Sequence, residues 1–238
     1  MTKHVNRVIV FFYYFCENLK VLKLMEPDKI IETERIPEPT LRRLPWYLAY
    51  IKLIADKGES FISSTQISRA INVSASQIAK DLSLVNVSGK TRVGYDVHIL
   101  IEVLENFLGF RRSHKAFLFG VGSLGGALLH DKGLSQYGLE IVAGFDINTD
   151  LTGKSINGIP VYNIDEFKSL QAEYGISIGI LTVPVDQAQE VAELMVDGGI
   201  RAVWNFTPFR IHMPESIVVQ NTSIYAHLAL MFNRLGNQ

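Results

Sequence analysis

The spacing of apolar residues separates a helical first part of the chain from a second part with the pattern of buried strands. In the first part, Leu44, Leu48, Ile51 and Ile54 follow helical spacing. They predict a first helix with Pro45 in its first turn, where a missing backbone N–H is tolerated.

Two short helices follow, each opened by a capping residue. Ser63 and Gln66 have the spacing of a capping box and predict a helix through Ile71. Ser74 and Gln77 repeat this spacing and predict a third helix directly after a tight turn. Two capped helices joined in this way are typical of a helix-turn-helix unit.

A hairpin and a fourth helix complete the first part. Residues 85–93 alternate apolar and polar positions around Ser88 and Gly89, which predicts a β-hairpin with its turn at the glycine. A hairpin at this place after a helix-turn-helix indicates a wing. A helix over Asp96–Leu108 and a short basic linker over residues 109–115 follow.

From residue 116 onward the apolar residues form continuous runs separated by helical patterns. The predicted strands are 116–119, 140–145, 177–183, 200–206 and 217–219, and the predicted helices are Leu124–His130, Asp165–Tyr174, Asp186–Asp197 and Ile224–Leu235. Continuous apolar runs between helices predict a parallel sheet that is buried on both faces. The second part is therefore expected to be a doubly wound α/β domain.

A glycine pattern lies where the first of these strands ends. Gly120, Gly122 and Gly125 form G-x-G-x-x-G between a strand and a helix, and the next strand ends in Asp146. In a dinucleotide-binding unit these glycines allow the tight turn, the approach of a pyrophosphate and close helix packing. An acid at the second strand tip accepts the ribose hydroxyls and repels a 2′-phosphate, which favours NAD(H) over NADP(H). A turn that serves packing alone is the alternative.

The candidate cofactor-binding residues come from the glycine turn and from two strand ends. They are Gly120, Val121, Gly122, Ser123, Leu124, Gly125, Asp146, Thr182, Val183 and Pro184. Residues 205–208 close the following strand and are expected to line the same crevice, because ligands of open α/β sheets bind at the carboxyl ends of strands.

Charge divides the chain at the same point as the apolar pattern. Residues 40–115 carry 11 Lys and Arg against 6 Asp and Glu, whereas residues 116–238 carry 6 against 12. This favours a polyanion as the partner of the first part, with a protein-interaction module as the alternative. The candidate DNA-binding residues are Arg42 and Arg43 on the first helix, Ser76, Gln77 and Lys80 on the third helix, and Lys90, Thr91 and Arg92 on the wing.

No membrane partner, metal site or catalytic group is expected. Cys16 is the single cysteine, which favours a reducing, cytoplasmic compartment. The histidines lack metal-ligand spacing. Residues 8–16 are apolar but too short to span a bilayer, so residues 1–24 are interpreted as an upstream-start extension or docking segment, with a signal peptide as the alternative. No proton donor or acceptor suited to hydride transfer lies near a strand end, which indicates that the nucleotide is a signal rather than a reagent.

Together these motifs resemble the Rex family of redox-sensing transcriptional repressors. The resemblance covers about residues 36 to 236 and rests on segments 43–45, 76–83, 89–95, 120–125, 145–146, 158–161, 181–184 and 205–208. It implies a homodimer that binds double-stranded operator DNA and NADH or NAD⁺, is released from DNA by NADH, and swaps its last helix onto the partner. The implied organisation is an N-terminal extension of unknown role (1–35), a winged-helix DNA-binding domain (36–112), a Rossmann NAD(H)-binding domain (113–221) and a swapped C-terminal helix (222–238).

The chain departs from the family pattern at five positions. Ala49, Ala79, Asp131, Ser223 and Ile224 stand where the family commonly has Arg, Arg, Tyr, Asp and an aromatic residue. Ala49 and Ser223 would remove both ends of an interdomain ion pair that the resemblance links to the redox response. One alternative is therefore a nucleotide-binding module that has lost operator recognition or redox coupling. A second is a small NAD-dependent oxidoreductase or a CoA-ligase-like domain.

Overall fold

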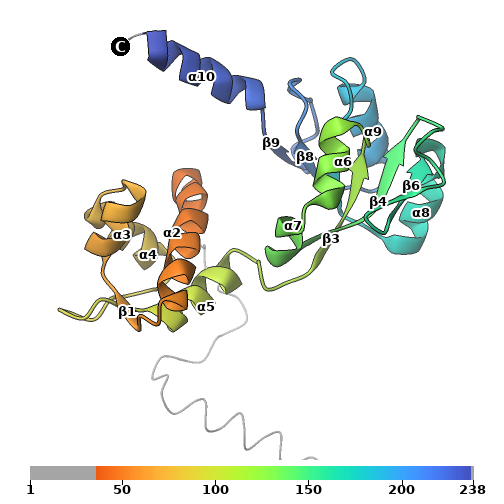
Figure 1. Ribbon diagram of the computed structural model, residues 1–238. Coiled ribbons are helices and arrows are strands. Elements are labelled where there is room, and N and C mark those ends of the chain that lie inside the picture. The colour runs from red at the N-terminus through yellow and green to blue at the C-terminus, as the bar shows by residue number, and fades with distance from the viewer. Residues whose placement is uncertain (1–35, 237–238) are drawn as a thin grey trace, which may run out of the picture. The chain divides into compact units, whose positions relative to one another are not determined.

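A computed structural model describes residues 36–236 of the chain (Figure 1). The interpretation of residues 1–24 and the position of Cys16 lie outside the described residues. The first domain contains α2 (Glu38–Asp56), β1 (Phe61–Ile62), α3 (Ser64–Ile71), α4 (Ala75–Leu84), β2 (Tyr95–Asp96) and α5 (Val97–Phe107). The order helix, helix-turn-helix, strand pair and helix is that of a winged-helix domain.

The caps of α3 and α4 confirm the helix-turn-helix prediction. Ser63 and Gln66 form a reciprocal capping box at the start of α3. Asn72 ends that helix in the left-handed conformation, at φ +55°. The Ser74 hydroxyl accepts from the N–H of Gln77, so α4 is capped as expected. The Gln77 side chain does not complete a second box, because it turns to Asp81 instead.

The first helix starts earlier than the sequence predicts. The N–H groups of Thr40 and Leu41 both donate to the carbonyl of Pro37, so α2 already begins at Glu38. Pro45 therefore lies inside the helix and not in its first turn, and that prediction was wrong. The helical spacing used for the prediction begins only at Leu44, and the first turns bury the polar Thr40, so apolar spacing could not reveal them.

The wing turns at a different place from the one predicted. Lys90 and Gly94 exchange two backbone hydrogen bonds around a turn in which Arg92 has φ +65°. The returning residues form β2, which pairs antiparallel with β1. The predicted turn at Ser88 and Gly89 was therefore wrong. Gly89 instead leaves room for the ring of Tyr95, which an added Cβ would approach to 3.2 Å.

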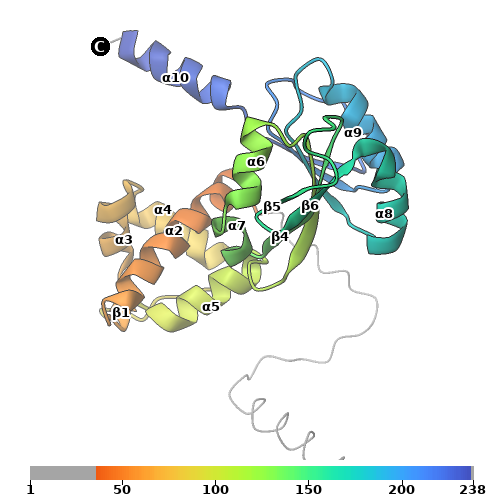
Figure 2. The same ribbon diagram turned by 45° about the vertical axis from the view of Figure 1, so that its right-hand side comes forward.

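The second domain has the predicted parallel sheet with helices on both faces (Figures 1 and 2). Its strands are β3 (His114–Phe119), β4 (Leu139–Asp146), β5 (Ser155–Ile156), β6 (Ile159–Asn163), β7 (Ile178–Leu181), β8 (Ala202–Asn205) and β9 (Val218–Asn221). Its helices are α6 (Ser123–His130), α7 (Gly133–Gln136), α8 (Phe167–Tyr174) and α9 (Ala188–Asp197), with a 3₁₀ turn at Ile164–Glu166. Helix α10 (Ile224–Gly236) follows β9.

The strand order is that of a Rossmann fold. Along the sheet the order is β5-β6-β4-β3-β7-β8-β9. All neighbours are parallel except β5, which pairs antiparallel with β6 at one edge. The chain crosses from β6 back to β7 beside the first strand, β3, so the order reverses next to the carboxyl end of β3. A doubly wound sheet binds ligands at this reversal.

Two apolar cores pack on the two faces of the sheet. One contains Leu129 of α6 together with Ala116 and Leu118 of β3. The other packs α8 and α9 against the alternate residues Phe117 and Phe119. In this second core the rings of Phe117, Phe119, Phe145 and Phe167 contact one another, with centroids 5.0–6.2 Å apart. Alternate residues of one strand thus fill both cores, as a sheet covered on both faces requires.

Replacing Phe167 by Ala tests whether the aromatic core holds the sheet and α8 together. Phe167 is fully buried, so the substitution leaves a cavity and should lower the free energy of unfolding by about 3–5 kcal/mol. Chemical denaturation measures the change. Phe209→Ala, at a residue that is 38% exposed, is the control and should lower the free energy of unfolding much less. Equal costs for the two variants would contradict this description of the core.

Candidate nucleotide cleft and nucleic-acid interface

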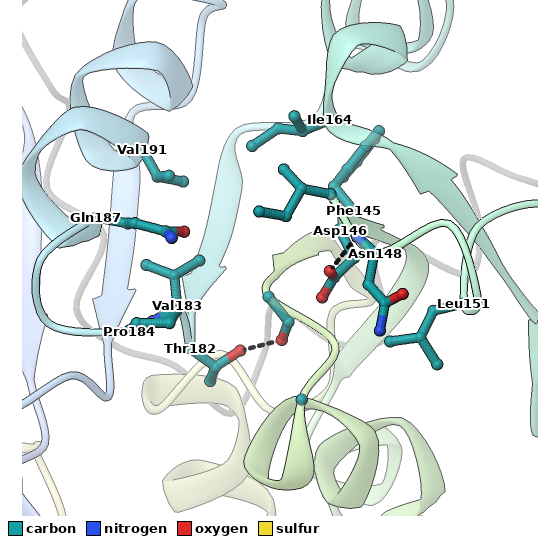
Figure 3. Close-up of a pocket in the computed structure, with 13 residues that line it drawn as sticks. Phe145, Asp146, Asn148, Leu151, Ile164, Thr182, Val183, Pro184, Gln187 and Val191 are labelled. Carbon is teal, nitrogen blue, oxygen red and sulfur yellow. Dashed lines mark hydrogen bonds between the residues drawn. The ribbon is translucent and has the colours of Figure 1, made fainter.

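A cleft of about 440 Å³ opens at the carboxyl ends of β3, β4 and β7 (Figure 3). One wall carries Asp146 at the end of β4 with Asn148 and Leu151 after it, and the opposite wall carries Val183 and Gln187 after β7. The glycine turn between β3 and α6 forms its base. The cleft therefore lies at the strand-order reversal, where an open α/β sheet binds a nucleotide.

The glycine turn is built from three glycines with different constraints. Gly120 has φ +91°, and an added Cβ would lie 2.8 Å from the carbonyl carbon of Thr182. A Cβ on Gly125 would collide with the Gly120 carbonyl oxygen. Gly122 has ordinary extended torsions, and an added Cβ would meet no protein atom within 4 Å. Two of the glycines are therefore required by the fold, whereas the absence of a side chain at Gly122 keeps the cleft open.

The N-terminus of α6 faces this cleft from its base. The first N–H groups of a helix lack intrahelical acceptors, and Gly122, at the N-cap, has no side chain that could bind them. Such a helix start attracts anions, and a pyrophosphate is the anion expected beside a glycine turn of this type.

Asp146 fixes the glycine turn and also lines the cleft. Its Oδ2 accepts from the Val121 N–H at 2.6 Å, and its Oδ1 accepts from the Asn148 N–H at 2.8 Å. Each carboxylate oxygen can accept a second hydrogen bond, so the pair can also receive two ribose hydroxyls. Val121 was predicted to contact the ligand, but its N–H donates to Asp146 and its side chain is buried. Its contact with a ligand stays a prediction.

Thr182 holds the turn from the neighbouring strand. Its hydroxyl donates to the carbonyl oxygen of Gly120 at 2.6 Å and lies 3.1 Å from that of Phe119. The predicted residues Thr182, Val183 and Pro184 line the cleft together with Gly120, Gly122 and Asp146. Ser123, Leu124 and Gly125 lie in the first turn of α6 and are not among the lining residues.

Several lining residues were missed by sequence reasoning. They are Phe145, Ile147, Asn148, Leu151, Ile164, Gln187 and Val191. Ile147 and Asn148 could have been found, since they follow directly after the predicted acid. Gln187 and Val191 come from the start of α9, and only the three-dimensional placement of that helix brings them to the cleft (Figure 3).

The segment 205–208 does not line the cleft as expected. Asn205 is fully buried, and its amide donates to the carbonyl of Phe209 and to the side chain of Asn221. Its Oδ1 accepts from both the N–H and the hydroxyl of Thr207. This segment is therefore a buried polar turn that secures the end of β8 to β9.

The helix-turn-helix presents several of the predicted DNA-binding residues to solvent. Ser76 and Lys80 on α4 and Lys90, Thr91 and Arg92 on the wing are exposed, as is Arg42 on α2. Gln77 is only half-buried, between these exposed positions and the interior. Exposure is needed for contact with a duplex, and DNA binding by these residues stays a prediction.

Arg43 has a different role from the predicted phosphate contact. Its Nε and Nη2 donate to the two oxygens of Asp81 at 2.7 and 2.8 Å, and its side chain is 21% exposed. The hydroxyl of Tyr47 donates to the same carboxylate at 2.6 Å. The hydrogen bonds with Asp81 raise the pKa of Arg43 above its ordinary value. Arg43 therefore joins α2 to α4, and a direct contact with DNA stays a prediction.

Two of the departures from the family pattern have local structural roles. The Ser223 hydroxyl accepts from the N–H of Ala226 at 3.2 Å and so caps the start of α10. Asp131 accepts from the N–H of Gly133 at 2.6 Å, at the start of α7. Ala49 is exposed and Ala79 is partly exposed. Nothing in the structure explains the loss of an arginine at these two positions.

Within residues 36–236 no group of three or more His, Cys, Asp or Glu side chains could hold a metal ion. No helix there is long and apolar enough to cross a bilayer.

A winged helix followed by a Rossmann-type cleft defines a two-domain protein that joins a DNA-binding module to a nucleotide-binding module. Residues 35–83 match the family described as "Putative DNA-binding protein N-terminus", and residues 111–209 match the "CoA binding domain" family. A redox-sensing transcriptional repressor Rex from Bacteroides thetaiotaomicron is 66% identical over 90% of this chain and 98% of its own length. The chain belongs to the Rex family of redox-sensing transcriptional repressors.

Solved structures of a Rex-family repressor called RSP share the fold. RSP in complex with β-NAD⁺ and operator DNA is 31% identical, with a TM-score of 0.81 over 85% of this chain and 93% of that chain. RSP in complex with β-NADH is 32% identical, with a TM-score of 0.77 over 85% of this chain and 95% of that chain. The predicted family and fold class are confirmed.

Proposed function

We propose that this chain is a redox-sensing transcriptional repressor that binds operator DNA through its winged helix and NADH or NAD⁺ in the Rossmann cleft. Membership of the Rex family, at 66% identity to a redox-sensing repressor, carries the proposal. The relative RSP has been solved with NAD⁺ and operator DNA and with NADH, which supports the same ligands here.

The nucleotide acts as a signal in this proposal. Asp146 is the one titratable side chain among the described residues that line the cleft, and its oxygens already hold backbone N–H groups. Hydride transfer to a substrate commonly uses a proton donor or acceptor beside the nicotinamide. The relatives are named as repressors rather than as enzymes, which supports a binding role at the chromosome and hence a cytoplasmic protein.

The cleft favours NAD(H) over its 2′-phosphorylated forms. The Asp146 carboxylate would accept the adenosine ribose hydroxyls and repel a phosphate in their place. Apolar side chains on both walls, Leu151 and Val183 among them, would contact the adenine ring. The free N–H groups of α6 would bind the pyrophosphate beside Gly122.

The working form is a homodimer in which α10 packs on the partner. Every residue of α10 is exposed within the chain, although Ile224, Leu228, Met231 and Leu235 form an apolar stripe with helical spacing. Exposed apolar surfaces of this kind mark interaction sites. A second copy of the chain is the proposed cover, in agreement with the swapped helix that the family resemblance implies.

Replacing Gly122 by Val tests the cleft. The fold has room for this side chain, but the side chain enters the space of the proposed pyrophosphate. The wild type is first used to select an operator duplex, and NADH should release it from that duplex. Gly122→Val should bind the same duplex but be released only at NADH concentrations about 100-fold higher, which corresponds to a loss of NADH binding free energy on the order of 3 kcal/mol. Gel shifts with NADH titration measure both effects.

Gly126→Ala is the matched control, because a Cβ there meets no atom closer than 3.9 Å. It should behave as the wild type. A Gly122→Val protein with unchanged NADH affinity would show that the glycine turn serves packing alone. Turnover of NADH by the wild type with a metabolite would favour the oxidoreductase alternative.

Replacing Lys80 by Glu tests the DNA surface. Reversal of this exposed charge on α4 should weaken operator binding by at least about tenfold. The dependence of DNA affinity on salt concentration should fall by about the share of one phosphate contact. NADH binding should be unchanged. Lys168→Glu makes the same charge change on α8 and serves as the control. If the two variants bind DNA equally well, α4 does not enter a groove.

Replacing Met231 by Glu tests the dimer. A charge in the apolar stripe of α10 should be buried without a partner on association, so the protein should sediment as a monomer at concentrations where the wild type is a dimer. Asn233→Glu places the same charge on the opposite face of the helix and should remain dimeric. Monomeric wild-type protein would refute the dimer.

A further inference from the structure

Asp81 is a buried carboxylate inside α4, the helix proposed to contact DNA. Its side chain is 0% exposed. From the described part of the chain its oxygens accept two hydrogen bonds from Arg43, one from Tyr47 and one from Gln77. Three of these bonds come from α2 and fix the carboxylate in place. The fourth comes from a half-buried residue of α4 that lies between the exposed Ser76 and Lys80.

The bond to Asp81 determines how the Gln77 amide is oriented. Gln77 Nε2 lies 2.8 Å from Asp81 Oδ1, one helical turn away. An ionised carboxylate only accepts hydrogen bonds, so the amide nitrogen and not the oxygen must face Asp81. Both oxygens of Asp81 also accept from the Arg43 guanidinium, so the carboxylate acts as an acceptor at both oxygens. The chemistry of the pair therefore excludes the flipped amide.

An amide held in this way retains a defined pair of groups for a further partner. Nε2 has a second N–H, and Oε1 remains an acceptor. The major-groove edge of adenine offers the complementary pair, an N6–H donor and the N7 acceptor. A glutamine that is free to rotate would lose side-chain entropy on binding, and the bond to Asp81 removes part of that loss in advance.

We propose that Asp81 is a positioning residue for operator recognition, which holds the Gln77 amide in the orientation that reads an adenine. Arg43 and Tyr47 support it by fixing the carboxylate from α2. This inference rests on the proposed function, because it requires sequence-specific DNA binding by α4. It extends that function by naming the base and the buried group behind the contact.

The test compares the full-length protein with variants on two duplexes. One duplex is selected by the wild type from a random pool, and the other has the same bases in scrambled order. The measured quantity is the ratio of the two dissociation constants. Gln77→Ala should reduce this ratio by about tenfold, since it removes a base contact. Asp81→Asn should also reduce it, because an amide has one acceptor oxygen and cannot accept from Arg43 at both positions while it fixes the Gln77 amide in one orientation.

Two further variants separate positioning from general stability. The double variant Gln77→Ala/Asp81→Asn should lose no more than either single variant, because both act on one contact. Leu104→Ala leaves a cavity in the domain core on α5 and removes no hydrogen bond from Asp81, so it should lower thermal stability and leave the ratio unchanged. Repeated selection should show that Gln77→Ala and Asp81→Asn lose their preference for adenine at the same base pair.

Several results would overturn the inference. They are additive losses in the double variant, an unchanged ratio in Asp81→Asn, and equal weakening on both duplexes. If Asp81→Asn does not fold, Asp81→Glu keeps the charge but moves the carboxylate by one methylene and should also lower the ratio. A Gln77 side-chain amide that rotates freely in NMR relaxation of the unbound wild type would refute the inference without any variant. A wild type that selects no duplex would refute the proposed function itself.

Discussion

The backbone turn after β3 passes so close to β7 that residue 120 has no room for a side chain. A Cβ there would lie 2.8 Å from the carbonyl carbon of Thr182, and the Thr182 hydroxyl holds the Gly120 carbonyl oxygen at 2.6 Å. This contact fixes where α6 starts and therefore where its N–H groups point. The direction of α6 and the position of Gly122 at the base of the cleft follow from this one close approach.

In each proposed binding surface a carboxylate fixes the local geometry before a ligand binds. Asp146 accepts a hydrogen bond from the Val121 N–H and so holds the glycine turn against β4. Asp81 accepts hydrogen bonds from Arg43 and Tyr47 of α2 and from Gln77 of α4, and so holds the two helices together. The two carboxylates differ in what remains available. Asp146 lines the cleft and can contact a ligand directly, whereas the buried Asp81 can act only through Gln77.

Much of the fold could be predicted from the sequence because the decisive signals are local. The caps at Ser63 and Ser74 and the glycine turn before α6 depend on neighbouring residues, and they lie where predicted. The short strands β5 and β6 were missed, since two- and five-residue strands at a sheet edge have too few positions for an apolar pattern. The wing turn was misplaced because Gly89 serves a contact with Tyr95, which the local sequence does not reveal.

The site was predictable only where its residues follow one another in the chain. Gly120, Gly122 and Asp146 were found from strand ends, whereas Gln187 and Val191 reach the cleft through the packing of α9. For Arg43 the sequence suggested a phosphate contact, because it is an arginine at the start of a basic domain, whereas the structure shows a contact inside the protein. Its partner Asp81 is 38 residues away, and no spacing rule joins them.

The ion pair between Arg43 and the buried Asp81 stands where apolar side chains could also pack. Removing two charges from water offsets most of their attraction, so a buried pair adds little net stability compared with apolar residues of the same size. Leu44 and Leu48 already bury α2 on the same domain core without any charge. What apolar packing cannot supply is direction: a carboxylate accepts from a defined nitrogen at a defined place, and a methyl group does not. The Arg43–Asp81 pair is therefore best understood through what it orients, which is the side chain of Gln77 on α4.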